Sequence, residues 1–446
     1  MPKTICFSLA LGLALLAAVA AYANQLDEFG FNARSVGLAN AYSALTDGPE
    51  ATYYNPGALI ESRDVRALAG YSFSVPALSL NQSGNANGTS PEVKEARTPP
   101  PGQWISTGVS GGIFDRVFFG LGMQIPIDGN NRRKIFTPDQ PYFLNYDTGI
   151  FGMTILPSVA VQLAPNFGLG ASARITLDGL GTLNTELSSA TGDSHAETMS
   201  QSQITGQAAP IFGFYARAFE FLRFALTYKG ASYSYFHKTE TQQVVPGNPS
   251  GYVDVTYAAR YNYIPREVTF GVVGEPDEHV LLTAELDWVG WSSYRPPFAN
   301  VQMNFSRLAA AKIPYTAPTI YEPQNANFKD TIVLRFGVEP RVNKYLVFRV
   351  GYAFEPSPAP TQDGTTTIIA PPASDISLGV GANFAGPKGD LVNIDIGITD
   401  QIGSSMTIGK NPAKMVDVNP TLNPAYQSLS VQAQYIYSSL TATFHF

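Results

Sequence analysis

Four charged residues interrupt strand-like segments that are otherwise apolar or small. Arg335 lies in IVLRFGV, Arg349 in YLVFRVG, and Glu285 and Asp287 in AELDWV. In alternating strands, all four fall on the face that carries the small and polar residues. A turn centred near Val342 would make the two arginines cross-strand neighbours, which is unfavourable unless acids or a bound anion compensate. The sequence therefore predicts either a salt-bridge network or a site for the headgroup of a carboxylate ligand.

Signals for catalysis or metal binding are weak. Gly108 to Gly112 match G-x-S-x-G around Ser110, but that motif needs a strand, a sharp turn and a helix, and a strand-like segment follows it here. The four histidines have no metal-ligand spacing, and no phosphate-binding loop is present. We predict no enzyme, cofactor or metal site. A barrel phospholipase stays an alternative, although His445 has no evident serine partner.

Composition and the N-terminus indicate an exported chain with little water-facing surface. Charged residues make up 14% of the 446 residues and aromatic residues 12%, whereas soluble domains carry about 25% charged residues. Residues 1–23 resemble a signal peptide, with Lys3, an apolar run and Ala21-Tyr22-Ala23 before the cleavage point. Its removal would also remove Cys6, the only cysteine. No basic cluster suggests a nucleic-acid partner.

The remaining chain reads as strands of period two, with large apolar side chains on one face and Gly, Ser and Thr on the other. Such a small, sparsely charged second face suits a barrel interior, with lipid outside; a secreted soluble β protein is the alternative. Short turns are expected near Asp115, Pro165, Glu220, Asp277, Arg341 and Pro387. Long connections are expected over 76–102, 128–150, 180–203, 237–252, 292–330, 356–373 and 401–430. Together they predict an all-β transmembrane antiparallel barrel of about 14 strands over residues 61–446.

The segment GLANAYSALTDGPEATYYNPGALIE, residues 37–61, differs from everything after it because it is helix-like. Its small residues would let a helix lie against a curved wall, and Asp47-Gly48-Pro49 would end that helix. Asn55, Pro56 and Gly57 predict a tight turn in which the glycine permits positive φ. A barrel of this size is too wide for its own side chains to fill. We therefore predict that residues 24–60 form a small helical plug in the lumen.

This segment, through Asn55-Pro56, resembles the N-terminal hatch of the FadL-type outer-membrane transporters. ELDWVGWSSY at 285–294 and the closing strand, which ends in Phe446, are also similar to that family. The resemblance implies uptake of long-chain fatty acids or other hydrophobic compounds, including aromatic hydrocarbons, by a bacterial outer-membrane protein that acts as a monomer. It implies passive passage through a plugged barrel and lateral release through a gap in the wall. A general porin, which would lack the plug, is a further alternative.

A lateral gap needs a strand whose pairing fails locally. FFGLGMQIPID is the candidate, because Gly120 and Gly122 weaken it and Pro126 cannot donate a ladder hydrogen bond. Prolines at 157, 210 and 265 have the same defect in later strands, so the choice is not unique. Aromatic residues at 288, 291 and 294 and the run YSYF at 233–236 could form interfacial girdles. The substrate itself is not identified by any of these features.

Overall fold

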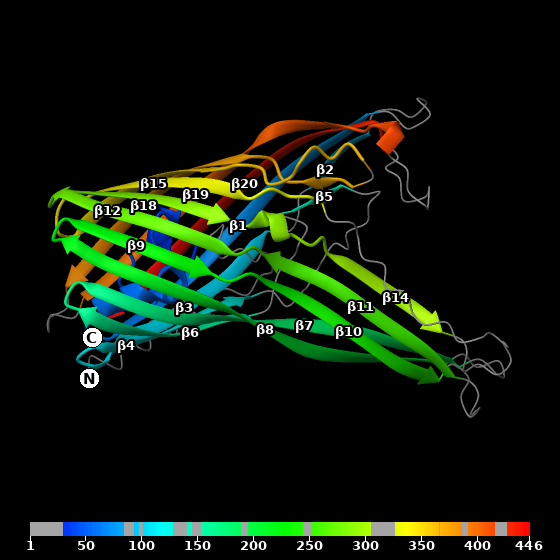
Figure 1. Cartoon of the computed structure of the whole chain (residues 1–446), viewed down its shortest axis with the longest axis horizontal. Helices are drawn as coiled ribbons and strands as arrows, with labels where there is room; N and C mark the ends of the chain where they lie inside the picture. The colour runs from blue at the N-terminus through cyan, green and yellow to red at the C-terminus, as the bar shows by residue number, and fades with distance from the viewer. Residues whose placement is uncertain are drawn as a thin grey trace.

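Fourteen antiparallel strands close into a barrel in the computed structural model, which describes residues 30–83, 93–97, 101–127, 141–144, 153–188, 195–243, 252–304, 326–364, 366–385, 391–414 and 426–446 (Figure 1). Closure occurs because the first strand pairs with the last strand on one side and with the second barrel strand on the other. The predicted fold class is therefore confirmed. The barrel strands are β1 (Arg66–Ser83), β3 (Gly102–Phe114), β4 (Val117–Pro126), β6 (Met153–Ala164), β7 (Phe167–Ser188), β8 (His195–Phe219), β9 (Leu222–Lys229), β12 (Glu267–Asp277), β13 (Val280–Val289), β15 (Thr331–Pro340), β16 (Leu346–Glu355), β18 (Ala373–Ala385), β19 (Leu391–Gly409) and β20 (Ser428–His445).

The period-two pattern matches the two faces of the wall. In β16, Phe348, Val350 and Tyr352 are 44%, 49% and 45% exposed, while Arg349 and Gly351 between them are buried. Large apolar side chains that would be costly in water therefore point outward, as expected where lipid is the solvent. The small and polar side chains point into the lumen.

Short turns join the strands at one end of the barrel, where the C-terminus also lies (Figure 1). Five of the six expected turns are confirmed, and the one near Pro387 lies outside the described residues. The long connections are shorter than expected. In the range 180–203, for example, β7 runs to Ser188 and β8 starts at His195. Strand pairing continues beyond the part of the barrel whose outer face is apolar. The strand residues there are polar, so the alternation of large apolar and small residues does not mark them.

Further elements lie at the other end of the barrel. β10 (Ser232–Gln243), β11 (Tyr252–Ile264) and β14 (Phe298–Asn304) form a separate three-stranded sheet. β2 (Val93–Arg97) pairs with the outer part of β1, and β5 (Tyr142–Phe143) pairs in parallel with β17 (Ile368–Ile369). Two short 3₁₀ helices complete this end, η2 (Trp291–Ser293) and η3 (Pro412–Lys414).

The N-terminal residues fill the lumen near the end with the short turns, drawn in blue inside the barrel (Figure 1). They form α3 (Ala33–Val36), α4 (Ala51–Tyr54) and η1 (Pro56–Glu61). The expected helix over the Ala-rich residues 37–46 is wrong: these residues form turns, with Ala39 and Asn40 at φ 50° and 61°. Some of their backbone groups bond within the plug, as where Ala41 N donates to Leu38 O (3.0 Å), and others bond to side chains of the wall, as described below. No helix among the described residues has the length and apolarity to span a membrane.

Candidate functional site: the plug and the lumen wall

Asn55, Pro56 and Gly57 seat the plug against two wall strands, β7 and β8. The Asn55 side chain accepts a hydrogen bond from Gly57 N (3.0 Å) and donates to Phe214 O (3.1 Å). The expected tight turn is formed, closed by Ala58 N donating to Asn55 O (3.0 Å), and it begins a 3₁₀ helix that Asn55 caps. The positive φ expected at Gly57 is wrong, because Gly57 is not among the described residues with positive φ. Gly57 is required for space: a Cβ there would lie 2.6 Å from the carbonyl oxygen of Gly213.

The inward glycines of the wall follow the outline of the plug. A Cβ at Gly170 would lie 2.3 Å from the Pro56 backbone, and one at Gly351 would lie 2.4 Å from Ala39 N. A Cβ at Gly397 would lie 2.4 Å from Ala33 O. Real Cβ contacts are longer, so these positions cannot carry a larger residue while the plug is seated. The small face seen in the sequence is therefore the surface on which the plug docks.

Space for the plug also explains two glycines of β4, the strand that was the candidate for the lateral gap. A Cβ at Gly120 would lie 2.6 Å from the Thr52 methyl group, and one at Gly122 would lie 2.4 Å from its hydroxyl. β4 is paired with β6 from Val117 to Gln124 and with β3 as far as Pro126. The described residues thus show two intact ladders along β4, and an opening there stays a prediction without support from the pairing.

Arg335, Asp287 and Glu285 form the centre of the contacts between plug and wall. Arg335 donates to Asp287 (2.9 Å) and to Glu355 (2.9 Å), and its third contact is the Ala39 carbonyl of the plug (3.3 Å). Glu285 accepts from the backbone N–H of Ser43 (2.9 Å) and also from its hydroxyl. All three side chains are buried, so each charge is compensated inside the lumen by other groups of the protein.

Arg349 belongs to a second network that also reaches the plug. It donates to Glu339 (2.8 Å) and Asp395 (2.7 Å), and Glu339 in turn accepts two hydrogen bonds of 2.9 Å from Arg34 of α3. This fork geometry orients both groups as well as neutralising them. The network thereby ties the first plug helix to β15, β16 and β19.

The expected opposition of the two arginines is wrong, because the turn is centred two residues later than expected and the residue opposite Arg335 therefore shifts by four. Arg335 pairs with Ala353, and the register places Arg349 opposite Glu339. The turn is centred on Lys344, because the Asn343 side chain accepts hydrogen bonds from the N–H groups of Tyr345 and Leu346. The structure therefore pairs each arginine with acids and separates the two like charges.

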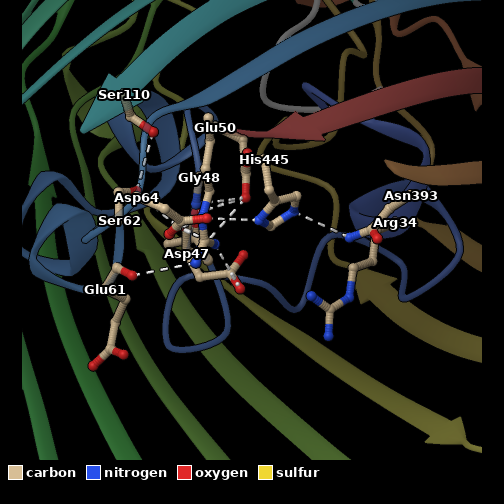
Figure 2. A network of polar contacts seen from close by, with 12 residues as sticks. Arg34, Asp47, Gly48, Glu50, Glu61, Ser62, Asp64, Ser110, Asn393 and His445 are labelled. Carbon is tan, nitrogen blue, oxygen red and sulfur yellow. Dashed lines mark hydrogen bonds and ion pairs between the residues drawn. The ribbon is translucent and has the colours of Figure 1, made fainter. Parts of the chain in front are cut away.

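A third polar cluster lies where the plug meets both ends of the barrel sequence (Figure 2). Arg66 at the start of β1 forms ion pairs with Asp47 (3.0 Å) and Asp64 (3.1 Å), and Asp64 also contacts His445 Nδ1 (2.9 Å). Burial alone would raise the pKa of the Asp47 carboxyl, but the Arg66 and Arg34 guanidinium groups outweigh it and lower that pKa. Burial likewise acts upward on Asp64, yet Arg66 and the bond with His445 hold its pKa below the usual range. The charged Asp47 carboxylate therefore holds the plug to Arg66, and the charged Asp64 carboxylate binds the same guanidinium from the wall side.

The possible nucleophile Ser110 lies in the interior of β3, where it pairs with Arg66 and Gly120. No sharp turn follows it, so the G-x-S-x-G sequence does not form the elbow that exposes a catalytic serine. Its hydroxyl donates to Ser62 Oγ (3.0 Å), and His445 bonds instead to Asp64 and Asn393 (Figure 2). Among the described residues, no group of three or more His, Cys, Asp or Glu is placed to hold a metal.

A second apolar layer lies beyond the charged residues, at the other end of the barrel. Phe143 of β5 and Ile369 of β17 are buried against Leu78 of β1 and Leu429 of β20. On the other side of these short strands, Tyr294 is stacked on Phe328 with ring centroids 4.4 Å apart. The expected girdle position of Tyr294 is therefore wrong, because the residue is 1% exposed, inside this cluster. Sequence reasoning missed the layer, since it is built from connections with no alternating pattern.

Comparisons with known proteins agree with this architecture. A family model described as "Outer membrane protein transport protein (OMPP1/FadL/TodX)" matches residues 13–446. Among solved structures, a Pseudomonas aeruginosa FadL homologue is 16% identical, with a TM-score of 0.65 over 93% of this chain and 98% of its own. The P. putida toluene transporter TodX is 14% identical, with a TM-score of 0.56 over 94% and 99%. The Ralstonia pickettii toluene transporter TbuX is 16% identical, with a TM-score of 0.53 over 95% and 100%. No curated protein matches the chain.

Proposed function

Because this chain belongs to the FadL/TodX family of outer-membrane transport proteins, we propose that it takes up hydrophobic small molecules by passive diffusion through its plugged barrel and releases them sideways into the membrane. The observation that carries the proposal is the apolar lumen behind the plug. The plug fills one end of the lumen, and the cluster around Phe143 and Ile369 lines the other end with apolar side chains. Such a lining favours lipophilic solutes over ions and sugars.

The substrate class is the finer part of this proposal. TodX and TbuX are described as toluene transporters and CymD as a monoaromatic hydrocarbon channel. The aromatic cluster of Trp291, Tyr294 and Phe328 supports aromatic hydrocarbons as substrates of this chain, with long-chain fatty acids as the second candidate. A fatty acid would need a cation for its headgroup, and both Arg335 and Arg349 are engaged by acids.

The plug contacts support a structural role for the four charged residues singled out in the sequence. We assign Arg335, Arg349, Glu285 and Asp287 to the retention of the plug, because their networks include Ala39, Ser43 and, through Glu339, Arg34. In the same proposal, residues 1–23 are a cleaved signal peptide and the chain is a non-enzymatic monomer in the bacterial outer membrane.

Uptake of labelled toluene and labelled oleate in a host that lacks its own transporters tests the function. Cells that make the protein should accumulate toluene faster than cells with an empty vector, and more strongly than they accumulate oleate. A control for folding is the shift in electrophoretic mobility that a barrel shows when it is heated. Properly folded protein with no gain in uptake of either compound would refute the proposal.

Deletion of residues 24–57 separates a plugged transporter from a general porin. In planar bilayers, the full-length protein should show low conductance and the deletion variant a large, steady conductance. Equal, large conductance of both proteins would favour the porin instead.

A further inference from the structure

The apolar outer face of the barrel ends at a sharp boundary along β12 and β13. Tyr228, Trp288 and Ile332 lie in one row of the paired strands, and Tyr228 and Ile332 are 39% and 52% exposed. Two residues beyond Trp288, on the side away from the short turns, Gly290 N donates to Arg266 O (2.8 Å). Aromatic residues mark the interface between hydrocarbon and water in outer-membrane barrels. Arg266, which is exposed, therefore lies where lipid headgroups begin.

The Arg266 guanidinium lies over the Trp288 ring, 5.3 Å from its centroid. Gly290 leaves room for this side chain, because a Cβ there would lie 2.7 Å from Arg266 Cγ. A cation over the face of an indole is attracted by the ring. In the part of the chain that the structure describes, no hydrogen bond or ion pair occupies the N–H groups of this guanidinium. The group is thus held in place while its donors are available to another molecule.

A second arginine is held at the same edge by another connection. Arg295 lies between η2 and β14, next to Tyr294, whose ring is stacked on Phe328. Directly after it, Pro296 O accepts hydrogen bonds of 3.3 Å from Arg260. The backbone on both sides of Arg295 is therefore fixed, while its side chain is exposed. Among the described residues, Arg295 has no hydrogen-bonded or ionic partner.

The two arginines lie around one aromatic side chain. The Tyr263 ring is 5.4 Å from the ring of Tyr294, which directly precedes Arg295. Burial raises the pKa of the Tyr263 hydroxyl, and the guanidinium groups of Arg266 and Arg295 both act against that rise. Asp330 is an acid that also acts on Tyr263, and its carboxylate accepts a backbone N–H of η2 (2.7 Å). Two cations thus converge beside this acid, and together the three groups carry a net positive charge.

Both arginines belong to connections that join the separate sheet of β10, β11 and β14 to the barrel (Figure 1). Arg266 lies between β11 and β12, and Arg295 precedes β14. Each is next to a proline, in Pro265-Arg266 and Arg295-Pro296. Proline fixes its own φ and restricts the residue before it, so both guanidinium groups extend from a stiff backbone. The two positive charges are therefore positioned before any ligand arrives.

The outer face of β19 and β20 has the opposite character. Its charged group is Asp400, and Gln434 Nε2 donates to both of its carboxylate oxygens (2.9 and 3.0 Å). Ile398 and Ile402, on either side of this acid, are 45% and 44% exposed. An anion would be repelled there, so the positive charge near Trp288 is a local feature of one face of the barrel.

We propose that Arg266, Arg295 and Trp288 form a binding site for the phosphate of a phosphorylated glycolipid, lipid A, in the outer leaflet. Short turns of outer-membrane barrels face the periplasm, so the end that carries these residues faces the outer leaflet. Guanidinium groups bind phosphate through paired N–H donors, and the indole suits the boundary between headgroup and acyl chains. A bound lipid would join the β11–β12 connection to the segment before β14 and steady the base of the separate sheet. The inference does not depend on what the barrel transports.

Binding of purified lipid A to the protein in detergent micelles tests this site. The probes are lipid A with both phosphates, the same lipid after enzymatic removal of its phosphates, and inorganic phosphate as a competitor. Arg266→Gln/Arg295→Gln removes both charges and keeps most of the side-chain length. The matched control is Arg116→Gln, which changes an exposed arginine in the turn between β3 and β4, at the opposite end of the barrel.

The double variant should bind lipid A ~25-fold more weakly than the parent, or ~5-fold for each arginine, the contribution of one basic residue near an anionic lipid surface. Arg116→Gln should bind like the parent. Lipid A without phosphates should bind the parent as weakly as intact lipid A binds the double variant. Arg266→Lys/Arg295→Lys should keep most of the affinity, because it retains both charges.

Equal affinity of the parent and the double glutamine variant for intact lipid A would overturn the proposal. Displacement of lipid A by millimolar inorganic phosphate would also overturn it, because the site would then be one for a free anion. The shift in electrophoretic mobility on heating checks that each variant is folded. If the double variant does not fold, Arg295→Gln alone gives the answer, since its side chain has no partner among the described residues, and unchanged affinity in that variant would refute its role.

Discussion

The pair between Arg34 and Glu339 offers the sharpest test of how the plug is held. The substitution Arg34→Met removes both 2.9 Å hydrogen bonds to Glu339 but keeps most of the side-chain volume. Glu339 is 3% exposed as a side chain and retains Arg349 at 2.8 Å, so it is not left unpaired. Breaking a buried ion pair costs about 3–5 kcal/mol, and the remaining partner reduces this to ~2 kcal/mol. The equilibrium between seated and released plug should therefore shift ~30-fold toward release.

The chain contains a matched control for this substitution. Glu275 also accepts from two arginines, Arg223 and Arg341, but both belong to the wall. Arg223→Met thus removes the same kind of bond without touching the plug. Single-channel recordings should show more frequent open events for Arg34→Met and parental behaviour for Arg223→Met.

Limited proteolysis provides a second measurement, because a released plug exposes its chain to a protease that a seated plug excludes. Cleavage within residues 30–62 should be faster in Arg34→Met by a similar factor. If the two variants behave alike in both assays, the reasoning that Arg34 anchors the plug is refuted.

Three further predictions follow from the contacts of the plug. Gly351→Val should unseat it, since overpacking costs about 1–3 kcal/mol, while Gly274→Val, at a position with nothing within 4 Å of the added Cβ, should conduct like the parent. Because the pKa values of Asp47 and Asp64 are lowered in the folded protein, their stabilisation is complete above the ordinary value near about pH 4 and is lost as pH falls through the lowered values. Bilayer recordings should accordingly show a closed channel at neutral pH and increased opening only in acid. Ser110→Ala should leave lipid hydrolysis at background, and any loss of a measurable lipase activity would revive the phospholipase alternative.

The strands were predictable because lipid contact imposes a strict pattern on them. Phe348, Val350 and Tyr352 alternate with small or charged residues, and that alternation alone fixes which face is inside. The pattern stops at the edge of the hydrocarbon, whereas hydrogen bonding does not, so the outer halves of β7 and β8 could not be recognised. The register between β15 and β16 was not predicted correctly for a local reason. The side-chain hydrogen bonds of Asn343 set the centre of the turn that joins the two strands.

Wall glycines illustrate why the candidate site was only partly predictable. Considered alone, Gly120 and Gly122 indicate a weakly paired strand. With the plug in place, the same two glycines leave room for the side chain of Thr52. Nothing in one sequence separates these interpretations, because the second depends on a segment some 70 residues away that folds into the lumen. The charged residues Arg335 and Arg349 were identified for their inward position. However, Ala39, which Arg335 contacts, and Arg34, which shares Glu339 with Arg349, belong to that same segment.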